Sequence, residues 1–367
     1  MEADENARSA QRGCASFRSV TMYEGGSVKV AVVGATGAVG ETLLRVLEER
    51  GVPVSELGAF ASRFRPDAAA FRGRRCDVHE TSEAALRGYD AVFFAGSDEA
   101  SERYVPALLE RGAIVIDNSA TYRMEPGVPL IVPEVNPQAV LPTHRLFPVG
   151  NCTAIILCVA LAPVRTAAGL VRAQVATYQA VSGAGRAGLD ELAAGERALA
   201  DGRPEPHPQA FAAAIARNVI PQIGSFDAAG WSGEENKVRA ETRKILDLPD
   251  LAIAVTSVRV PVRTAHSEAV FFETERATSV AELAAAFERA PGVAYHAEAI
   301  VTPREVEGTD AVHVARLRGG AALEADPRES QRHFQMWIVG DQLRKGAATN
   351  AVQILELAIA RGAVTSA

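Results

Sequence analysis

The chain has 367 residues and a formal net charge of −7 at pH 7, and hydrophobic residues make up 48% of it. This length exceeds what one hydrophobic core usually organises, so we expect a globular, enzyme-sized protein of two domains. The negative charge gives no general attraction to nucleic acid or to an anionic membrane, and the arginines are scattered rather than gathered in one stripe. We therefore expect neither nucleic acid nor membrane as a partner.

Hydropathy and cysteine usage point to a protein of a reducing compartment. The longest apolar stretch, residues 154–164, is far shorter than the roughly 20 residues that a membrane-spanning helix needs. The four cysteines show neither metal-ligand spacing nor the density of a disulfide scaffold, so we predict no metal site and a cytoplasmic location. Residues 1–27 are polar and lack the apolar core of a secretory signal. We expect them to form a disordered leader, with Met22 as a candidate start.

The first region after this leader has the pattern of parallel βαβ units. An apolar, β-branched run at 28–33 ends at Gly34 and is followed by helical periodicity up to Gly51. Strand-like runs recur at 57–61, 91–95 and 113–117, separated by amphipathic stretches such as 99–111. Strands that alternate with helices in this way predict a parallel, dinucleotide-binding sheet.

The turn after the first strand is rich in glycine. Gly34, Gly37 and Gly40 lie between the strand and the helix, where glycines let a backbone approach a pyrophosphate and a helix N-terminus stabilises its charge. The spacing GxxGxxG is not the commonest form of this motif, so a glycine-rich turn without a ligand is the alternative reading.

The second strand ends without the acidic residue that often binds the adenosine ribose of NAD. Ser62, Arg63 and Arg65 stand there instead, and arginine suits a 2′-phosphate, so we favour NADP(H) as the cofactor. The alternative is that both arginines simply face solvent.

Cys152 is the candidate nucleophile. It follows Gly150 and Asn151 and precedes an apolar helical run, which places it at a helix N-terminus, where a thiolate is stabilised. The polar neighbours Asn151 and Thr153 argue against burial, whereas Cys158 lies inside the run and has the pattern of a buried structural cysteine. The backbone amides at such a helix start could also hold an oxyanion.

Beyond residue 150 the chain changes character. Long alternating strands are predicted at 173–180, 252–260, 268–275 and 311–317, which indicates an antiparallel or mixed sheet in a second domain. Helices are predicted at 188–200 and 234–246, a proline-rich loop at 201–208, and a final helix at 347–361 that could return to the first domain.

His266 follows one of these strand patterns and is the candidate acid and base, because an imidazole moves protons near neutral pH. The six other histidines have the pattern of packed or solvated residues. Arg123, Lys237 and Arg259 are cations in ordered segments and could hold a substrate carboxylate or phosphate.

Several strings of the chain, taken together and in order, resemble the aspartate-semialdehyde dehydrogenase family. The most specific is the stretch 178–188, YQAVSGAGRAG, which resembles the family segment with the substrate-binding glutamine. The others cover nearly all of the chain after residue 27 and are VGATGAVG (33–40), DNSATYR (117–123), VPEVN (132–136), NCT (151–153), NVIP (218–221), ETRKIL (241–246), VRVPV (258–262) and GAATNA (346–351).

This resemblance implies a role for each matching residue. Cys152 is the nucleophile, His266 the acid and base, and Gln179 orients the acyl group. Arg259 holds the substrate α-carboxylate, and Glu234 helps to bind the substrate. The phosphate is surrounded by Arg123, Asn151 and Lys237, and the cofactor contacts are expected from Gly34, Thr36, Gly37, Ala38, Val39, Ser62, Arg63, Arg65, Ser97, Ser182, Gly183 and Gln342.

The same resemblance implies the reaction and the assembly. The expected reaction is the NADPH-dependent reduction of L-aspartyl 4-phosphate to L-aspartate 4-semialdehyde and phosphate through a Cys152 thioester, in lysine, threonine and methionine biosynthesis. The expected partner is a second copy in a homodimer. Two departures stand out: the segment after the second strand reads Arg63-Phe64-Arg65 and is one residue shorter than usual, and Ala154 replaces a family threonine.

The predicted fold is therefore α/β, with a Rossmann-like dinucleotide-binding domain over 28–150 and 342–367. An α+β catalytic and dimerisation domain with a mixed sheet is predicted over 151–341. Three other readings remain open: a sister acyl-phosphate reductase such as N-acetyl-glutamyl-phosphate reductase or glyceraldehyde-3-phosphate dehydrogenase, a non-catalytic relative that kept only the fold, and a cysteine hydrolase, which would leave the glycine loop unexplained.

Overall fold

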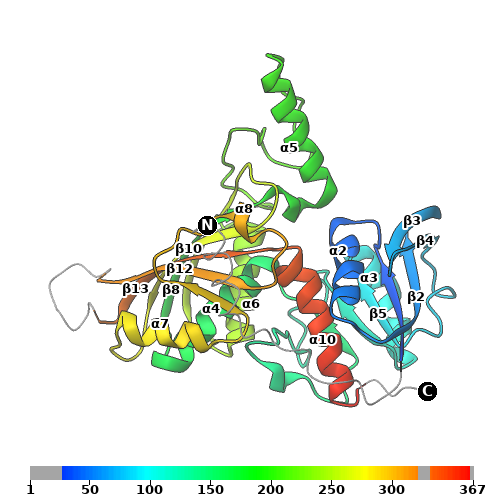
Figure 1. The fold of residues 1–367 in the computed structure, drawn as a ribbon, viewed down its shortest axis with the longest axis horizontal. Helices are drawn as coiled ribbons and strands as arrows, with labels where there is room; N and C mark the ends of the chain where they lie inside the picture. The colour runs from blue at the N-terminus through cyan, green and yellow to red at the C-terminus, as the bar shows by residue number, and fades with distance from the viewer. Residues whose placement is uncertain (1–26, 321–330, 364–367) are drawn as a thin grey trace, which may run out of the picture. The chain divides into compact units, whose positions relative to one another are not determined.

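The computed structural model describes residues 27–320 and 331–363. The predicted leader, including Met22, lies outside these residues apart from Ser27. The described chain divides into two compact units, one formed by residues 27–152 and 346–363 and the other by 153–320 and 331–345. Both units are shown as ribbons in Figure 1.

The first unit is built on a seven-stranded sheet in the order β3-β4-β2-β1-β5-β6-β7. Its strands are β1 (Val28–Val33), β2 (Val54–Ala61), β3 (Arg65–Phe71), β4 (Arg74–Glu80), β5 (Ala91–Phe94), β6 (Ile114–Asp117) and β7 (Leu146–Pro148). All neighbours pair in parallel except β3 and β4, which form an antiparallel hairpin. The strand order reverses beside β1, as in doubly wound nucleotide-binding sheets, and this confirms the Rossmann-like prediction.

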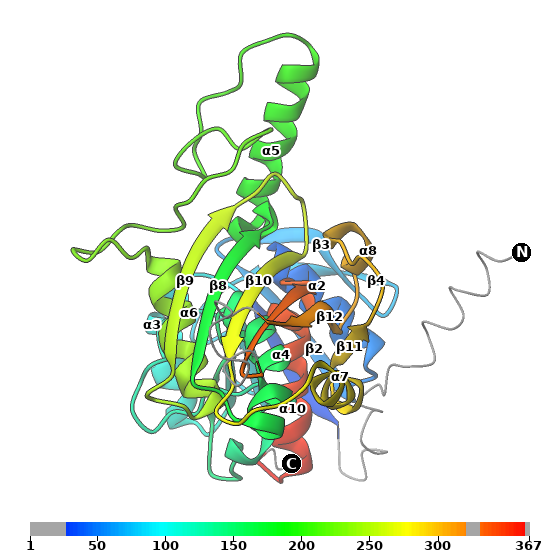
Figure 2. The same cartoon turned by 90° about the vertical axis from the view of Figure 1, so that its left-hand side faces the viewer.

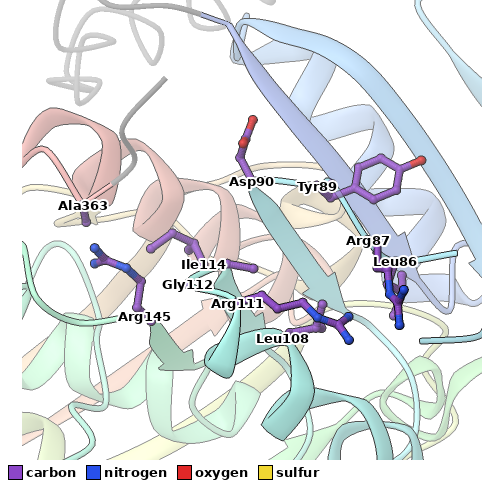
Figure 3. Close-up of a pocket in the computed structure, with 12 residues that line it drawn as sticks. Leu86, Arg87, Tyr89, Asp90, Leu108, Arg111, Gly112, Ile114, Arg145 and Ala363 are labelled. Carbon is purple, nitrogen blue, oxygen red and sulfur yellow. The ribbon is translucent and has the colours of Figure 1, made fainter. Parts of the chain in front are cut away.

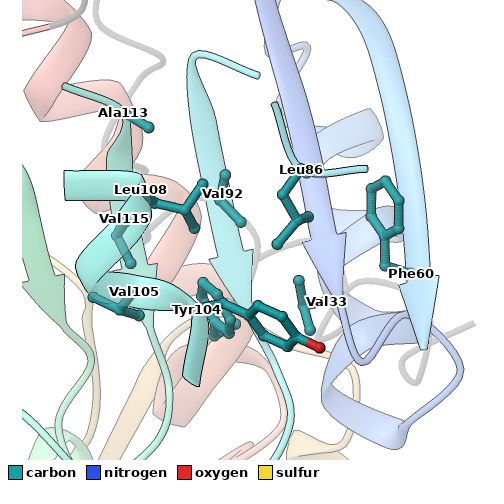
Figure 4. Packing of buried hydrophobic residues seen from close by; sticks show 11 residues of the cluster. Val33, Phe60, Leu86, Val92, Tyr104, Val105, Leu108, Ala113 and Val115 are labelled. Atoms are coloured by element: carbon teal, nitrogen blue, oxygen red, sulfur yellow. The ribbon is translucent and has the colours of Figure 1, made fainter. Parts of the chain in front are cut away.

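The helices of this unit are α2 (Ala38–Glu49), α3 (Asp98–Glu110) and α10 (Thr349–Ala360), with a short 3-10 turn, η1 (Pro137–Ala139). Figure 4 shows Tyr104, Val105 and Leu108 of α3 packed against Val33 and Val92 on one face of the sheet. The final helix returns to this unit, where α10 neighbours α2 and β6. Alternate residues of each buried strand therefore face opposite helical layers.

The second unit contains a six-stranded mixed sheet in the order β11-β12-β13-β10-β8-β9. Its strands are β8 (Arg172–Gln179), β9 (Ala252–Arg259), β10 (His266–Glu273), β11 (Val293–His296), β12 (Val312–Gly319) and β13 (His333–Gly340). The strand β10 is antiparallel to both β8 and β13, while β8 and β9 are parallel. Figure 2 shows β9, β8 and β10 side by side. The prediction of a mixed sheet is confirmed.

The remaining helices are α4 (Cys152–Ala168), η2 (Val181–Ala184), α5 (Gly185–Ala200), α6 (Gly233–Leu246), α7 (Val280–Arg289), α8 (Pro303–Val306) and η3 (Arg344–Ala348), a π-helical segment. The start of α6 is fixed by a capping box between Ser232 and Glu235, which satisfies amides that the first turn leaves without helical partners. Among the described residues, no helix is both long and apolar enough to span a membrane.

Candidate active site

The glycine-rich turn forms a backbone cradle that side chains would fill. Gly34 has a φ of +85°, and a Cβ added there would lie 2.9 Å from the carbonyl carbon of Ala95. A Cβ on Gly40, in the first turn of α2, would lie only 2.2 Å from the carbonyl oxygen of Gly34. Glycine is therefore required at both positions, and the turn stays narrow beside the N-terminus of α2. This geometry fits a pyrophosphate held by backbone amides.

The structure separates the two arginines that the sequence placed after the second strand. Ser62 and Arg63 are exposed, whereas Arg65 begins β3 and its Nη1 donates to Thr36 Oγ1 of the glycine turn at 3.3 Å. The Nε of Arg65 is buried and has no hydrogen-bond partner within the described chain. This guanidinium lies beside the glycine-rich turn, and its Nε–H can donate to an anionic group such as a 2′-phosphate.

The loop after β6 is organised by a buried carboxylate. Asp117 accepts hydrogen bonds from Ser101 Oγ at 2.9 Å and from the Ser119 amide and hydroxyl at 2.8 and 2.7 Å. Burial raises the pKa of the Asp117 carboxyl, and these bonds oppose the shift. The same loop carries Arg123, whose Nη2 donates to the Asn118 carbonyl at 2.7 Å. A nearly buried guanidinium is thus presented at the carboxyl end of the parallel strands, where such sheets bind ligands.

Cys152 is the first residue of α4 and is partly buried. The predicted helix start is confirmed, and Cys158 is fully buried as expected. Asn151 and Thr153 are themselves buried, at 6% and 0% exposed, yet Cys152 is only partly buried, as predicted. The thiol lies at the N-terminus of α4, where the helix dipole favours negative charge, so this position can stabilise a thiolate or an oxyanion.

In the second unit, three strands bring predicted site residues to one end of the sheet. Gln179 and Arg259 end the parallel strands β8 and β9 and are register partners. His266 begins the antiparallel strand β10, next to the register pair of Ser267 and Tyr178. Because β8 and β9 end, and β10 begins, at the same end of the sheet, all three side chains lie together there. In the sequence they are up to 87 positions apart. Gln179, Arg259 and His266 are all nearly or fully buried.

A single peptide unit orients two of these groups. The Ala180 amide donates to Nδ1 of His266 at 3.0 Å, and the Ala180 carbonyl accepts from Nη1 of Arg259 at 2.8 Å. Because Nδ1 accepts a hydrogen bond, the neutral imidazole carries its proton on Nε2. Burial, together with the charge of Arg259, holds the pKa of His266 well below its usual range. The imidazole is therefore neutral near pH 7 and offers Nε2–H as a donor.

Gln179 is fixed through both ends of its amide. Its Oε1 accepts from Thr177 Oγ1 at 3.0 Å, and its Nε2 donates to Oε1 of Glu234 at 3.0 Å. Glu234 is 8% exposed and lies in the first turn of α6. Lys237, one turn further along α6, is exposed. The structure thus joins Gln179 to Glu234 directly and leaves the ammonium of Lys237 at the surface of this unit.

Gly183, a predicted cofactor residue of this unit, lies against Arg259 and His266. A Cβ added to Gly183 would lie 2.8 Å from Nη1 of Arg259 and 3.3 Å from Nε2 of His266, so only glycine fits without displacing them. Ser182 accepts a hydrogen bond from Nε2 of Gln342. Ser97, another predicted cofactor residue, is the exposed N-cap of α3 in the first unit.

Two residues close in the chain to Gln179 and His266 were not predicted from the sequence. Ala180 acts through its backbone, which no side-chain pattern reveals. Glu268 lies two residues after His266 on the same face of β10, is fully buried, and has no hydrogen-bond partner for either oxygen within the described residues. Burial holds the pKa of this carboxyl well above its usual range. The sequence signal for Glu268 was a charged residue within a strand pattern that is otherwise largely apolar.

A separate depression lies at the opposite, amino end of the parallel sheet. It is lined by residues that include Arg87, Arg111, Arg145, Tyr89 and Asp90 (Figure 3). None of the predicted site residues lines it. In the part of the chain that the structure describes, no cluster of three or more metal-ligating side chains is present.

Comparison with protein families agrees with this geometry. Residues 29–142 match the model of the semialdehyde dehydrogenase NAD binding domain, and residues 161–345 match the model of the semialdehyde dehydrogenase dimerisation domain.

Individual proteins match over nearly the whole chain. The chain is similar to aspartate-semialdehyde dehydrogenase of Aquifex aeolicus, with 40% identity over 92% of this chain and 99% of the relative. It is 39% identical to aspartate-semialdehyde dehydrogenase 2 of Vibrio cholerae, over 90% and 97%. Among solved structures, aspartate semialdehyde dehydrogenase II of Vibrio cholerae complexed with ASA superposes with a TM-score of 0.84 at 38% identity, covering 91% of this chain and 99% of that one.

Proposed function

Because the chain belongs to the aspartate-semialdehyde dehydrogenase family, we propose that it reduces L-aspartyl 4-phosphate to L-aspartate 4-semialdehyde and phosphate. The observation that carries this proposal is the buried group of Gln179, Glu234, Arg259 and His266 at one end of the six-stranded sheet. A buried guanidinium, an uncharged imidazole and a fixed amide are the groups needed to bind a carboxylate-bearing acyl compound and to move a proton.

The chemistry begins at Cys152. Its thiolate attacks the acyl carbon of the 4-phosphate and forms a thioester, while the phosphate leaves with the bonding electrons of the C–O bond. Arg123 and Lys237 balance the charge of the departing phosphate, and Asn151 borders it. Gln179 orients the acyl group, Glu234 helps to hold the substrate, and Arg259 binds its α-carboxylate through the fork of its guanidinium.

A nicotinamide cofactor held at the turn of Gly34 and Gly40 would supply the hydride that reduces the thioester on Cys152 to a hemithioacetal. In this step Nε2–H of His266 donates to the developing oxyanion. Collapse of the hemithioacetal oxyanion then breaks the C–S bond, expels the thiolate of Cys152 and re-forms the carbonyl of the aldehyde, while the Nε2 proton that was shared with the oxygen stays on His266. In the reverse direction the same residues would support oxidation of the aldehyde by NADP in the presence of phosphate.

We assign NADP(H) rather than NAD(H) as the cofactor. The support is the cradle formed by Gly34 and Gly40 together with Arg65, whose buried Nε has no hydrogen-bond partner among the described residues and lies beside Thr36. A solved relative from Candida albicans is described with NADP, and at 21% identity and a TM-score of 0.71 it shares the fold.

The proposed activity predicts phosphate-dependent formation of NADPH from L-aspartate 4-semialdehyde and NADP, followed by absorbance. NAD in place of NADP and buffer without phosphate are the controls. Activity with N-acetyl-glutamyl or glyceraldehyde substrates instead would point to a sister acyl-phosphate reductase. Folded protein that binds NADP but turns over none of these substrates would contradict the catalytic assignment and favour a non-catalytic relative.

We further propose that a second copy of the chain covers one face of the six-stranded sheet. On this face Tyr178 and Phe271 are 40% and 44% exposed, and Tyr178 contacts Trp337 with ring centroids 5.5 Å apart. Both aromatic residues lie on neighbouring strands, within the region that matches a dimerisation-domain model. Large apolar side chains gathered on an exposed sheet face are typical of a protein interface.

Phe271→Lys is therefore expected to weaken dimerisation, because it places an ammonium in an interface that must exclude water. Sedimentation at decreasing protein concentration should show monomers at concentrations where the unchanged protein is dimeric, with a dissociation constant raised about tenfold or more. Ile300→Lys is the matched control, since Ile300 is 79% exposed and lies outside the sheet. Equal dissociation constants for the two variants would place the interface elsewhere.

A further inference from the structure

Ala265, the residue immediately before His266, has a strained backbone. Its φ of +68° lies in the left-handed region, where a Cβ crowds the neighbouring carbonyl, and the residue is completely buried. Such a conformation persists only when surrounding contacts hold it. One contact is direct: the Ala265 amide donates to Oε1 of Gln342 at 2.8 Å.

The position of Gln342 follows from strand pairing. His266 lies opposite Gly340 in the antiparallel pair of β10 and β13, so the residues just after β13 run beside those just before β10. The intervening Asp341 fixes this turn, because its carboxylate accepts from the amides of Gly308 and Leu343, each at 2.8 Å. The side chain of Gln342 is therefore presented to Ala265 by a well-supported backbone, and it is only 2% exposed.

The other end of the Gln342 amide reaches the Ser182–Gly183 turn, which lies against Arg259 and His266. Its Nε2 donates to Ser182 Oγ, and the Ser182 amide donates in turn to the Arg263 carbonyl at 3.1 Å. The next residue, Gly183, is the one whose absent Cβ leaves room for the ring of His266. One amide side chain thus ties the segment before His266 to the turn that borders its Nε2.

We propose that Gln342 is a positioning residue for His266: it holds Ala265 in the left-handed conformation and keeps the Ser182–Gly183 turn against the imidazole, so that Nε2 is presented in one orientation. This inference rests on the proposed catalytic role of His266 and goes beyond the contact with the cofactor that the family resemblance implies for Gln342. The two roles can be distinguished at Ala265. A positioning role depends on the backbone conformation of Ala265, whereas a cofactor contact does not.

A cycle of two substitutions separates these roles. Gln342→Ala removes both hydrogen bonds, and Ala265→Gly removes the steric cost of a positive φ, because glycine adopts such angles readily. We expect Gln342→Ala to lower kcat about tenfold to hundredfold through misplacement of the imidazole. Adding Ala265→Gly should restore most of this loss and return the pH profile of kcat to that of the unchanged protein. The dissociation constant for NADPH, measured by fluorescence titration, should stay within about twofold throughout.

The opposite pattern would overturn the inference: a weakened NADPH affinity in Gln342→Ala, with no recovery of kcat on adding Ala265→Gly, leaves Gln342 as a cofactor contact only. If the unchanged protein shows no turnover, the proposed function fails, but the inference remains testable by thermal unfolding. Ala265→Gly should then stabilise the Gln342→Ala protein less than it stabilises the unchanged one, because Ala265 has already left the strained conformation in that variant, and strictly additive shifts would refute the coupling. Gln342→Met, which preserves side-chain volume, serves for the same cycle if the alanine variant does not fold.

Discussion

Cys152→Ala is expected to abolish the phosphate-dependent reduction of NADP, with a loss of about a millionfold, as when the nucleophile of other covalent catalysts is removed. The reason is that no other group at the start of α4 can form the thioester. Rapid quenching followed by mass spectrometry should find an acyl adduct on the peptide that contains Cys152 in the unchanged protein. The variant should show none.

Cys158→Ala is the matched control, because Cys158 lies on the same helix and is fully buried. Burial raises the pKa of its thiol, which keeps the group protonated and unreactive. We expect this variant to retain activity and to lose about 1 kcal/mol of stability from the small cavity. Measurable turnover by Cys152→Ala, or equal inactivity of both variants, would show that the nucleophile is assigned incorrectly.

His266→Asn is expected to lower kcat about a hundredfold to ten-thousandfold while leaving some turnover, because loss of a general acid slows a step without removing the covalent route. His207→Asn is the control, since His207 is exposed on the loop after α5. Rapid mixing should still show thioester formation in His266→Asn. Residual activity as low as that of Cys152→Ala would contradict the distinction between acid and nucleophile.

His266 also links stability to pH. Its pKa in the folded protein lies well below the usual 6.5, so folding favours the neutral ring. The contribution of the neutral ring to the free energy of unfolding is fully present above the unfolded pKa of about 6.5. It is lost as pH falls below this value, because the unfolded state then binds the proton more readily than the folded state. Burial lowers the pKa of His313 to about 4, so this residue also makes the protein less stable as pH falls. The free energy of unfolding should therefore fall less steeply between neutral and mildly acidic pH in His266→Asn than in the unchanged protein.

Much of the site was visible in local patterns. The glycine turn after β1 and the helix that begins at Cys152 depend on neighbouring residues, and both were predicted near their observed positions. The hairpin of β3 and β4 was not predicted, because its sequence mixes charged and small residues without a clear alternation. Arg65 was consequently assigned to a loop, whereas it begins β3 and contacts Thr36.

The sequence by itself determined the alternation of strands and helices around the glycine-rich turn, the cradle at Gly34 and the placement of Cys152, since periodicity, turn chemistry and helix ends act over a few residues. Only the tertiary structure decided which distant groups meet. Gln179 bonds Glu234 across 55 residues, and Gln342 reaches Ala265 across 77. Those contacts depend on strand pairing and on how buried side chains pack, and both are settled by the free energy of the whole fold rather than by any local segment.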